Sequence, residues 1–258
     1  MPKVTSKDGT TIAYDQSGQG PAVILVDGAF CYRNFGPMGA LSPLLEPQFT
    51  VLKYDRRGRG ESGDTLPYAI EREIEDISAV IEAAGGSAAV YGISSGAALA
   101  LEAVISGLNI NKLALYEPPY NDDTKSEWAA YRSQLSDLLA QDRRGDAVAL
   151  FMRYVGTPDD AIAGMRQAPM WPAFEAIAHT LAYDAAVLGD GSVPTGRAAS
   201  VTIPTLVMAG GDGFPFMQEN AVKLEKALPN AQRRILEGQT HDVAADVMAP
   251  ALIEFFAG

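Results

Sequence analysis

One stretch of the chain is the strongest indicator of its fold: Ala88-Ala89-Val90-Tyr91-Gly92-Ile93-Ser94-Ser95-Gly96. Its first four residues form a short apolar run of the kind found in buried strands, and the small apolar residues 97–103 predict a helix buried on all sides. The pentapeptide between them has the pattern G-x-S-x-G, in which a serine occupies a sharp turn from a strand into a helix. The pattern predicts that Ser94 lies at the carboxyl end of a sheet, beside a helix N-terminus that favours developing negative charge.

Apolar runs elsewhere predict the other strands of this sheet. Four of them read as strands buried within it: 22–26, 50–54, 113–116 and 205–209, and a further segment, 233–236, is strand-like. Two earlier segments, near 3–6 and 11–14, predict a hairpin at an exposed edge. Helical patterns alternate with these runs, as in the apolar positions of 70–81. Alternating strands and helices predict an α/β fold with a mostly parallel, eight-stranded sheet flanked by helices.

Between residues 121 and 199 this alternation stops, and the patterns are helical only. Trp128, Tyr131 and Leu135 fit one amphipathic helix, 148–154 fits a second, and 172–188 predicts another. The strand–helix alternation resumes after Pro204. We therefore predict a core formed by residues 1–120 and 200–258, with an inserted all-helical cap formed by residues 121–199.

The composition disfavours several classes of function. Of the 258 residues 47% are hydrophobic and 20% charged, which excludes a wholly disordered chain. The net charge of −12 disfavours binding to nucleic acids and to anionic membranes. With one cysteine and two histidines, neither a disulfide nor a metal site built from Cys and His is expected. We expect a cytoplasmic protein with a small-molecule substrate and no cofactor, metal, nucleic-acid or membrane partner, since no signal peptide or long apolar run is visible.

A serine hydroxyl is a weak nucleophile at neutral pH and needs an adjacent base. His241 lies between the strand-like 233–236 and the last helix, so the sequence predicts that it reaches the carboxyl end of the sheet beside Ser94. The other histidine, His179, lies in a predicted cap helix and is the alternative base.

The base in turn needs a carboxylate that fixes its tautomer and stabilises its charged form. Asp212 follows the strand 205–209, and its place after the serine and before the histidine matches the order Ser…Asp…His. Glu117 and Asp122 follow the preceding strand and are the alternatives. The sequence favours Asp212.

Taken together, the motifs resemble those of the α/β-hydrolase-fold superfamily, in particular serine hydrolases with a helical cap. Three further segments carry this resemblance: Asp27-Gly28, 54–62 and 239–241. The resemblance implies a nucleophile, a base, an acid and two backbone N–H donors that form the oxyanion hole, namely Ser94, His241, Asp212, Ala29 and Ser95. The chain departs from the superfamily at Asp27, where relatives usually have histidine.

Six residues are predicted to border the substrate pocket: Asp27, Phe30, Cys31, Trp128, Tyr131 and Trp171. Because an unpaired buried charge is costly, we expect Asp27 to turn toward backbone donors of 28–33 or toward Arg33. The cysteine is expected to pack rather than react, and the arginine cluster in 56–59 is expected to be structural.

The function predicted from these residues is a serine hydrolase of small, mostly apolar carboxylic esters or lactones, acting through a Ser-His-Asp acyl-enzyme mechanism. One alternative is a ligand-binding or receptor-like protein with weak hydrolysis. Others are a biosynthetic enzyme of the cyclase or lyase type, and a C–C bond hydrolase or perhydrolase that uses the same triad.

Overall fold

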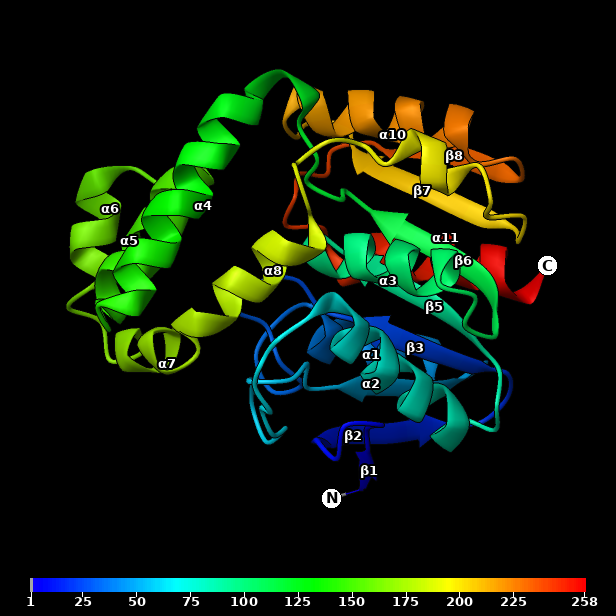
Figure 1. The fold of residues 1–258 in the computed structure, drawn as a ribbon. Helices are drawn as coiled ribbons and strands as arrows, with labels where there is room; N and C mark the ends of the chain where they lie inside the picture. The colour runs from blue at the N-terminus through cyan, green and yellow to red at the C-terminus, as the bar shows by residue number, and fades with distance from the viewer. Residues whose placement is uncertain (1) are drawn as a thin grey trace.

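The computed structural model describes residues 2–258, which fold around one eight-stranded sheet (Figure 1). Its strands are β1 (Lys3–Thr5), β2 (Thr11–Gly18), β3 (Ala22–Val26), β4 (Thr50–Tyr54), β5 (Ala88–Ile93), β6 (Ile110–Tyr116), β7 (Thr205–Gly210) and β8 (Ala231–Leu236). They lie in the order β1-β2-β4-β3-β5-β6-β7-β8. The pairs β1–β2 and β2–β4 are antiparallel and the others are parallel, which confirms the predicted fold class.

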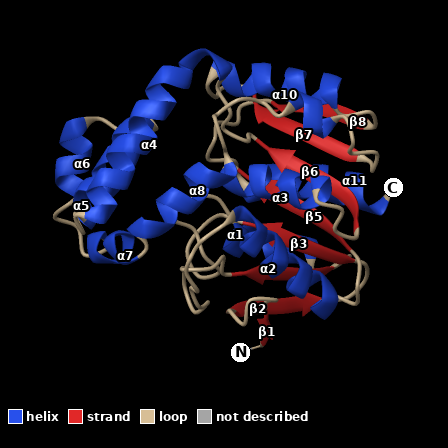
Figure 2. Ribbon diagram, in the orientation of Figure 1, coloured by secondary structure: helices blue, strands red, loops and turns tan. Residues whose placement is uncertain are grey.

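Helices cover both faces of the sheet (Figure 2). One face packs against α1 (Met38–Leu45) and α11 (Ala245–Ala257), and the other against α2 (Ile70–Ala83), α3 (Ser95–Ile105) and α10 (Pro215–Ala227). As predicted, residues 97–101 of α3 are fully buried. The predicted edge hairpin forms, but β2 also pairs with β4, and Ile12 and Ala13 are buried there.

The chain between β6 and β7 is helical, as predicted, and we call the part from Lys125 to Val187 the cap. Its helices are α4 (Lys125–Ala140), α5 (Arg144–Tyr154), α6 (Asp159–Met165), α7 (Trp171–Ala176) and α8 (Leu181–Val187). Short turns η1 (Asp122–Thr124) and α9 (Thr195–Ala198) flank it. Figure 1 shows α4 to α7 to one side of the sheet, with α8 returning toward α3.

The single helix predicted over 172–188 is wrong. The structure divides this segment into α7, the 3₁₀ turn η2 (Ala178–Thr180) and α8. At the break Ile177 has φ −107° and ψ 10°, and the Thr180 hydroxyl donates to the Ile177 carbonyl at 2.8 Å. Threonine hydroxyls that bond nearby carbonyls compete with regular helix hydrogen bonding.

The turn between β5 and α3 leaves no space for side chains beside its serine. A Cβ atom added to Gly92 would lie 2.7 Å from the Ala97 Cα, and one added to Gly96 would lie 2.8 Å from the Asp27 carbonyl carbon. Both neighbours are backbone atoms, which cannot rotate away as a side chain would. The two glycines are therefore required for β5, α3 and the end of β3 to meet.

Gly92→Ala is expected to lower the free energy of unfolding by about 2–3 kcal/mol, because the added methyl forces the backbone apart. Gly39→Ala in α1 is the matched control, since its added Cβ would meet nothing within 4 Å. The control should be neutral or stabilise the protein by up to about 1 kcal/mol. Urea unfolding of both variants tests this, and equal effects would contradict the steric argument.

Candidate active site

Ser94 lies at the carboxyl end of β5 with strained backbone angles, φ 57° and ψ −131°. Its N–H donates to the carbonyl of Tyr116 at the end of β6, 2.9 Å away, and this bond holds the turn against the neighbouring strand. The residue is half-buried and directly precedes helix α3. As predicted, the turn therefore places the serine beside a helix N-terminus.

Backbone strain is concentrated at this end of the sheet. Among the non-glycine residues from 2 to 258, four have positive φ: Phe30, Ser94, Glu117 and Asp142. The first three follow the ends of β3, β5 and β6, which are adjacent in the sheet. Non-glycine residues held in such conformations cost free energy and cluster at functional sites.

His241 pairs with Glu117. The His241 Nδ1 lies 2.7 Å from the Glu117 Oε2, and the Glu117 side chain is fully buried while that of the histidine is 38% exposed. The other carboxylate oxygen, Oε1, accepts the Gly210 N–H at 2.8 Å, so β7 also fixes the carboxylate. The Glu117 N–H donates to the Met208 carbonyl at 3.1 Å. Strand β7 thus holds both the backbone and the carboxylate of Glu117, whose second oxygen contacts His241.

Asp212, which the sequence favoured as the partner of the histidine, does not contact it. Its backbone N–H donates to the Gln239 carbonyl at 2.9 Å, but its side chain is exposed and makes no hydrogen bond to the rest of residues 2–258. The choice of Asp212 is therefore corrected to Glu117. The reason is local: the loop after β7 presents Asp212 to solvent, whereas the strained backbone of Glu117 brings its carboxylate beside His241.

The other two alternatives are engaged elsewhere. Asp122, in η1, accepts the Val193 N–H at 3.2 Å and pairs with Lys223 of α10 at 2.7 Å. These bonds connect η1 to α10. His179 lies in η2, where its Nε2 is 3.1 Å from the Asp64 Oδ2. Neither is paired with Glu117 or His241.

The predicted oxyanion donors lie in two segments that meet at the serine. A Cβ added to Gly28 would be 2.9 Å from the Ser94 Cβ and 3.5 Å from its Oγ, so the loop after β3 packs directly on Ser94. The N–H groups of Ala29 and Ser95 donate to no acceptor within residues 2–258. Ser94 and His241 share no hydrogen bond in this same part of the chain, a bond that commonly tightens only with substrate bound.

Asp27 does not turn toward the donors expected for it. Its side chain is buried, and its Oδ1 has no hydrogen-bond partner within residues 2–258. Arg33 instead pairs with Asp15 at 2.6 Å and with Asp55 at 3.1 Å. The Asp27 Oδ1 and the Cys31 Sγ both lie beside Gly36. A Cβ added to Gly36 would be 3.2 Å from the Asp27 Oδ1 and 3.0 Å from the Cys31 Sγ.

Burial dominates the protonation of both groups. It raises the pKa of Asp27 from 3.8 to about 7, although Arg59 and Arg56 oppose this rise. Burial, together with the charge of Asp27, raises the pKa of the Cys31 thiol to about 12. The thiol is therefore protonated at neutral pH and is a poor nucleophile.

The predicted pocket aromatics fall into two groups. Phe30 contacts cap rings, with centroids 5.2 Å from Phe151 and 5.0 Å from Phe174. The others pack within the cap region: the Trp128 Nε1 donates to the Gly189 carbonyl at 3.0 Å and its ring stacks on Tyr131. Trp171 donates to Glu175 at 2.8 Å. Among the predicted pocket aromatics, Phe30 is thus the one that connects the loop after β3 to the cap.

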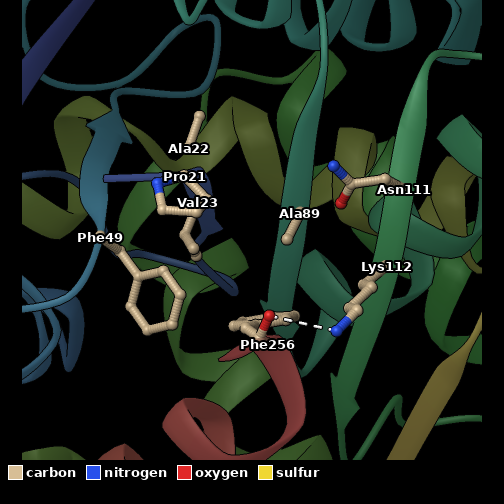
Figure 3. Close-up of a pocket in the computed structure, with 8 residues that line it drawn as sticks. All are labelled: Pro21, Ala22, Val23, Phe49, Ala89, Asn111, Lys112 and Phe256. Carbon is tan, nitrogen blue, oxygen red and sulfur yellow. Dashed lines mark hydrogen bonds between the residues drawn. The ribbon is translucent and has the colours of Figure 1, made fainter. Parts of the chain in front are cut away.

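A cavity of about 270 Å³, whose lining residues are drawn in Figure 3, lies at the other end of the sheet. It is bordered by Ala22, Ala89 and Lys112, near the amino ends of β3, β5 and β6, whereas Ser94 follows the carboxyl end of β5. There the Lys112 ammonium donates to the carbonyls of Phe255 and Phe256 at 3.0 and 3.1 Å and caps α11. This cavity is not part of the candidate active site.

Two further features bear on the predictions from composition. Within residues 2–258, no group of three or more His, Cys, Asp or Glu side chains is arranged to hold a metal ion. None of the helices in that range has both the length and the apolar character needed to cross a membrane.

Comparison with known proteins identifies the family of the chain. The sequence model of the alpha/beta hydrolase family matches residues 17–252. The chain belongs to the alpha/beta hydrolase family. It is similar to the crystal structure of an alpha/beta hydrolase from Sphaerobacter thermophilus, with 53% identity, a TM-score of 0.90 and coverage of 99% of this chain and 100% of that one.

More distant members of the alpha/beta hydrolase fold have the same architecture. The enol-lactonase from Burkholderia xenovorans is 20% identical, with a TM-score of 0.74 and full coverage of both chains. A thermophilic esterase from Thermogutta terrifontis is 20% identical, with a TM-score of 0.76 over 99% of this chain and 97% of that one. At this level of identity the likeness concerns the fold.

The raised pKa of Asp27 predicts how the stability of this alpha/beta hydrolase depends on pH. The unfolded carboxyl loses its proton near pH 3.8 and the folded one near pH 7. In that window the folded state binds more protons, so the free energy of unfolding falls as pH rises, by up to about 1.4 kcal/mol per pH unit. Asp27→Asn removes this titration while keeping the charges around it: Arg59, Arg56, Asp55 and Lys53.

Urea unfolding at about pH 5 and about pH 8 measures the effect. The stability of Asp27→Asn relative to wild type should be greater at the higher pH. Asp212→Asn, at an exposed carboxylate without a hydrogen bond, is the control and should show no such change. A difference between wild type and Asp27→Asn that is the same at both pH values would contradict a neutral Asp27.

Proposed function

We propose that this hydrolase cleaves small, mostly apolar carboxylic esters or lactones, with Ser94 as nucleophile, His241 as base and Glu117 as the acid that orients the base. The observation that carries the proposal is the 2.7 Å contact between the His241 Nδ1 and the buried Glu117 carboxylate. It supplies the base–acid pair that an activated serine requires, with Glu117 directly after β6, the neighbour of β5 in the sheet, and His241 in the loop after β8.

The pairing assigns the tautomer of the histidine. With Nδ1–H donating to the Glu117 Oε2, the Nε2 atom is left with a lone pair that accepts the proton of the Ser94 hydroxyl. The buried carboxylate then stabilises the imidazolium that forms. Because the other oxygen of Glu117 is held by the Gly210 N–H, the carboxylate cannot rotate freely away from the base.

The remaining steps follow from this arrangement. Ser94 Oγ attacks the ester carbonyl, and the tetrahedral oxyanion accepts hydrogen bonds from the N–H groups of Ala29 and Ser95. His241 then gives its proton to the leaving alcohol, and an acyl group remains on the serine. Water attacks the acyl-enzyme with His241 again acting as base, and the carboxylic acid leaves.

The surroundings of the oxyanion loop favour an apolar substrate. Phe30 follows the donor Ala29 directly, and its ring contacts Phe151 and Phe174 of the cap. The chain carries a net charge of −12, which disfavours polyanionic substrates. These two properties support uncharged esters or lactones over phosphorylated or polycarboxylate compounds.

Ser94→Ala is expected to reduce hydrolysis of short p-nitrophenyl esters by about 10³-fold or more, as in triad deletions of serine hydrolases. Loss of a half-buried hydroxyl should leave the fold intact. Ser106→Ala, at an exposed serine at the other end of α3, is the control and should retain wild-type activity. Undiminished hydrolysis by the Ser94→Ala enzyme would refute the nucleophile assignment.

Glu117→Gln is expected to reduce kcat by about 10³–10⁴-fold, because an amide can hold the histidine in the wrong tautomer. Asp212→Asn removes a carboxylate that also follows the carboxyl end of a strand but does not contact His241. The kcat of this variant should therefore stay close to that of wild type. Steady-state kinetics of the two variants on one ester compare them directly. A larger loss of kcat in Asp212→Asn than in Glu117→Gln would instead identify Asp212 as the acid.

A further inference from the structure

A buried cluster of charges joins the cap to the core beside the serine. Asp184, in cap helix α8, accepts hydrogen bonds from the Arg56 Nη1, the Arg59 Nη2 and the Ser95 Oγ, each at 2.7 Å. All four side chains are buried. One cap carboxylate therefore contacts the residue that follows the nucleophile as well as two core arginines.

The same two arginines hold the loop that follows β3. The Arg59 Nη1 donates to the Gly28 carbonyl at 2.5 Å, and the Arg56 Nη1 donates to the Asp27 carbonyl at 3.3 Å. Both segments that carry the predicted oxyanion donors are thus connected to Asp184. The loop after β3 is connected to it through Arg56 and Arg59, and Ser95 bonds to it directly.

The bond to the Gly28 carbonyl sets the direction of an oxyanion donor. The C=O of Gly28 and the N–H of Ala29 belong to one planar trans peptide and point in opposite directions. Fixing the carbonyl on Arg59 therefore fixes the N–H on the side away from the guanidinium. A charge-assisted hydrogen bond to the carbonyl also polarises the peptide, which makes its N–H a stronger donor.

The charge balance of the cluster depends on Asp184. Arg56 has a second carboxylate, Glu73, at 2.7 and 2.8 Å. Within residues 2–258, the carboxylate paired with Arg59 is Asp184. Burial would raise the pKa of Asp184, but Arg59 and Arg56 outweigh it and keep that pKa below its ordinary value. The carboxylate is therefore charged, and removing its charge would leave Arg59 buried and unneutralised.

We propose that Asp184 is a positioning residue: it couples the docked cap to the geometry of the oxyanion hole, acting on Ala29 through Arg59 and on Ser95 directly. The inference rests on the proposed function, because it assigns these two N–H groups to the transition state. It means that the oxyanion hole has its active geometry only when α8 is docked against the core.

The test compares two buried Arg–Asp pairs. Asp76 pairs with Arg57 at 2.7 and 2.8 Å and is as buried as Asp184, but within residues 2–258 that pair makes no hydrogen bond to the loop after β3. Asp184→Asn should lower kcat on an ester by about 10- to 100-fold and leave KM little changed. This loss of kcat is at most that expected when one oxyanion donor is removed. Asp76→Asn should keep a kcat close to wild type at temperatures where both variants are folded.

A thionoester substrate separates positioning from general damage. Its C=S sulfur is a weaker hydrogen-bond acceptor than C=O, so its cleavage depends less on the oxyanion hole. Asp184→Asn should therefore lower the rate on the ester more than the rate on the matching thionoester. The rate on the ester divided by the rate on the thionoester should fall. A distortion of the whole site would lower both rates by the same factor, and an unchanged ratio would overturn the proposal.

Ser95→Ala provides a second variant that keeps both ion pairs and removes the hydroxyl bond to Asp184, together with the longer contact of 3.4 Å that the Arg56 Nη1 makes with the same hydroxyl. It should lower the same ratio in the same direction, by a smaller factor. If Asp184→Asn does not fold, this variant decides the question alone, and an unchanged ratio again overturns the proposal.

The proposed substrate class is tested separately. If the wild-type enzyme cleaves no ester, that class fails, and the rate at which a fluorophosphonate labels Ser94 replaces the ester assay, because its phosphoryl oxygen also occupies the oxyanion hole. Slower labelling of Asp184→Asn than of Asp76→Asn then supports the positioning role, and equal labelling refutes it. Absence of labelling in the wild-type enzyme refutes both the nucleophile and the positioning role.

Discussion

The close approach of three backbone segments around Ser94 is the constraint on which the rest of the site depends. Gly92 and Gly96 allow α3 to begin directly on β5 and against the end of β3, at distances that a side chain would prevent. This contact places both the α3 N-terminus and the loop after β3 beside the Ser94 hydroxyl. The small residues that follow in α3 extend the same close packing, because they let the helix lie fully buried on the sheet.

Buried charge is the second organising feature of this acidic protein. Arg56, Arg57 and Arg59 are almost completely buried, and each is paired with at least one carboxylate. Such pairs add little net stability, because desolvation offsets their attraction, but losing one partner is costly. Their effect is therefore mainly geometric. In this chain that geometry includes the position of the cap, since one of the carboxylates, Asp184, comes from α8.

The pairing of His241 with Glu117 shows how sheet topology brings distant residues together. Ser94, Glu117 and His241 follow β5, β6 and β8, so the carboxyl edge of a parallel sheet gathers all three. The carboxylate that contacts the base is the buried one, whose backbone adopts φ 46° after β6. Burial away from water strengthens its interaction with the histidine, whereas an exposed carboxylate would be screened by solvent.

The sequence by itself determined the parallel sheet, the turn at Ser94 and the helical insertion, because apolar periodicity and glycine spacing are local properties. Tertiary structure alone decided three points: the pairing of His241 with Glu117, the burial of the Asp27 Oδ1 without a hydrogen-bond partner among residues 2–258, and the contact of Asp184 with Arg59. The first and last join residues 124 and 125 positions apart. Several carboxylates reach the same edge of the sheet, and which of them faces the base depends on backbone angles and side-chain directions that no local pattern records.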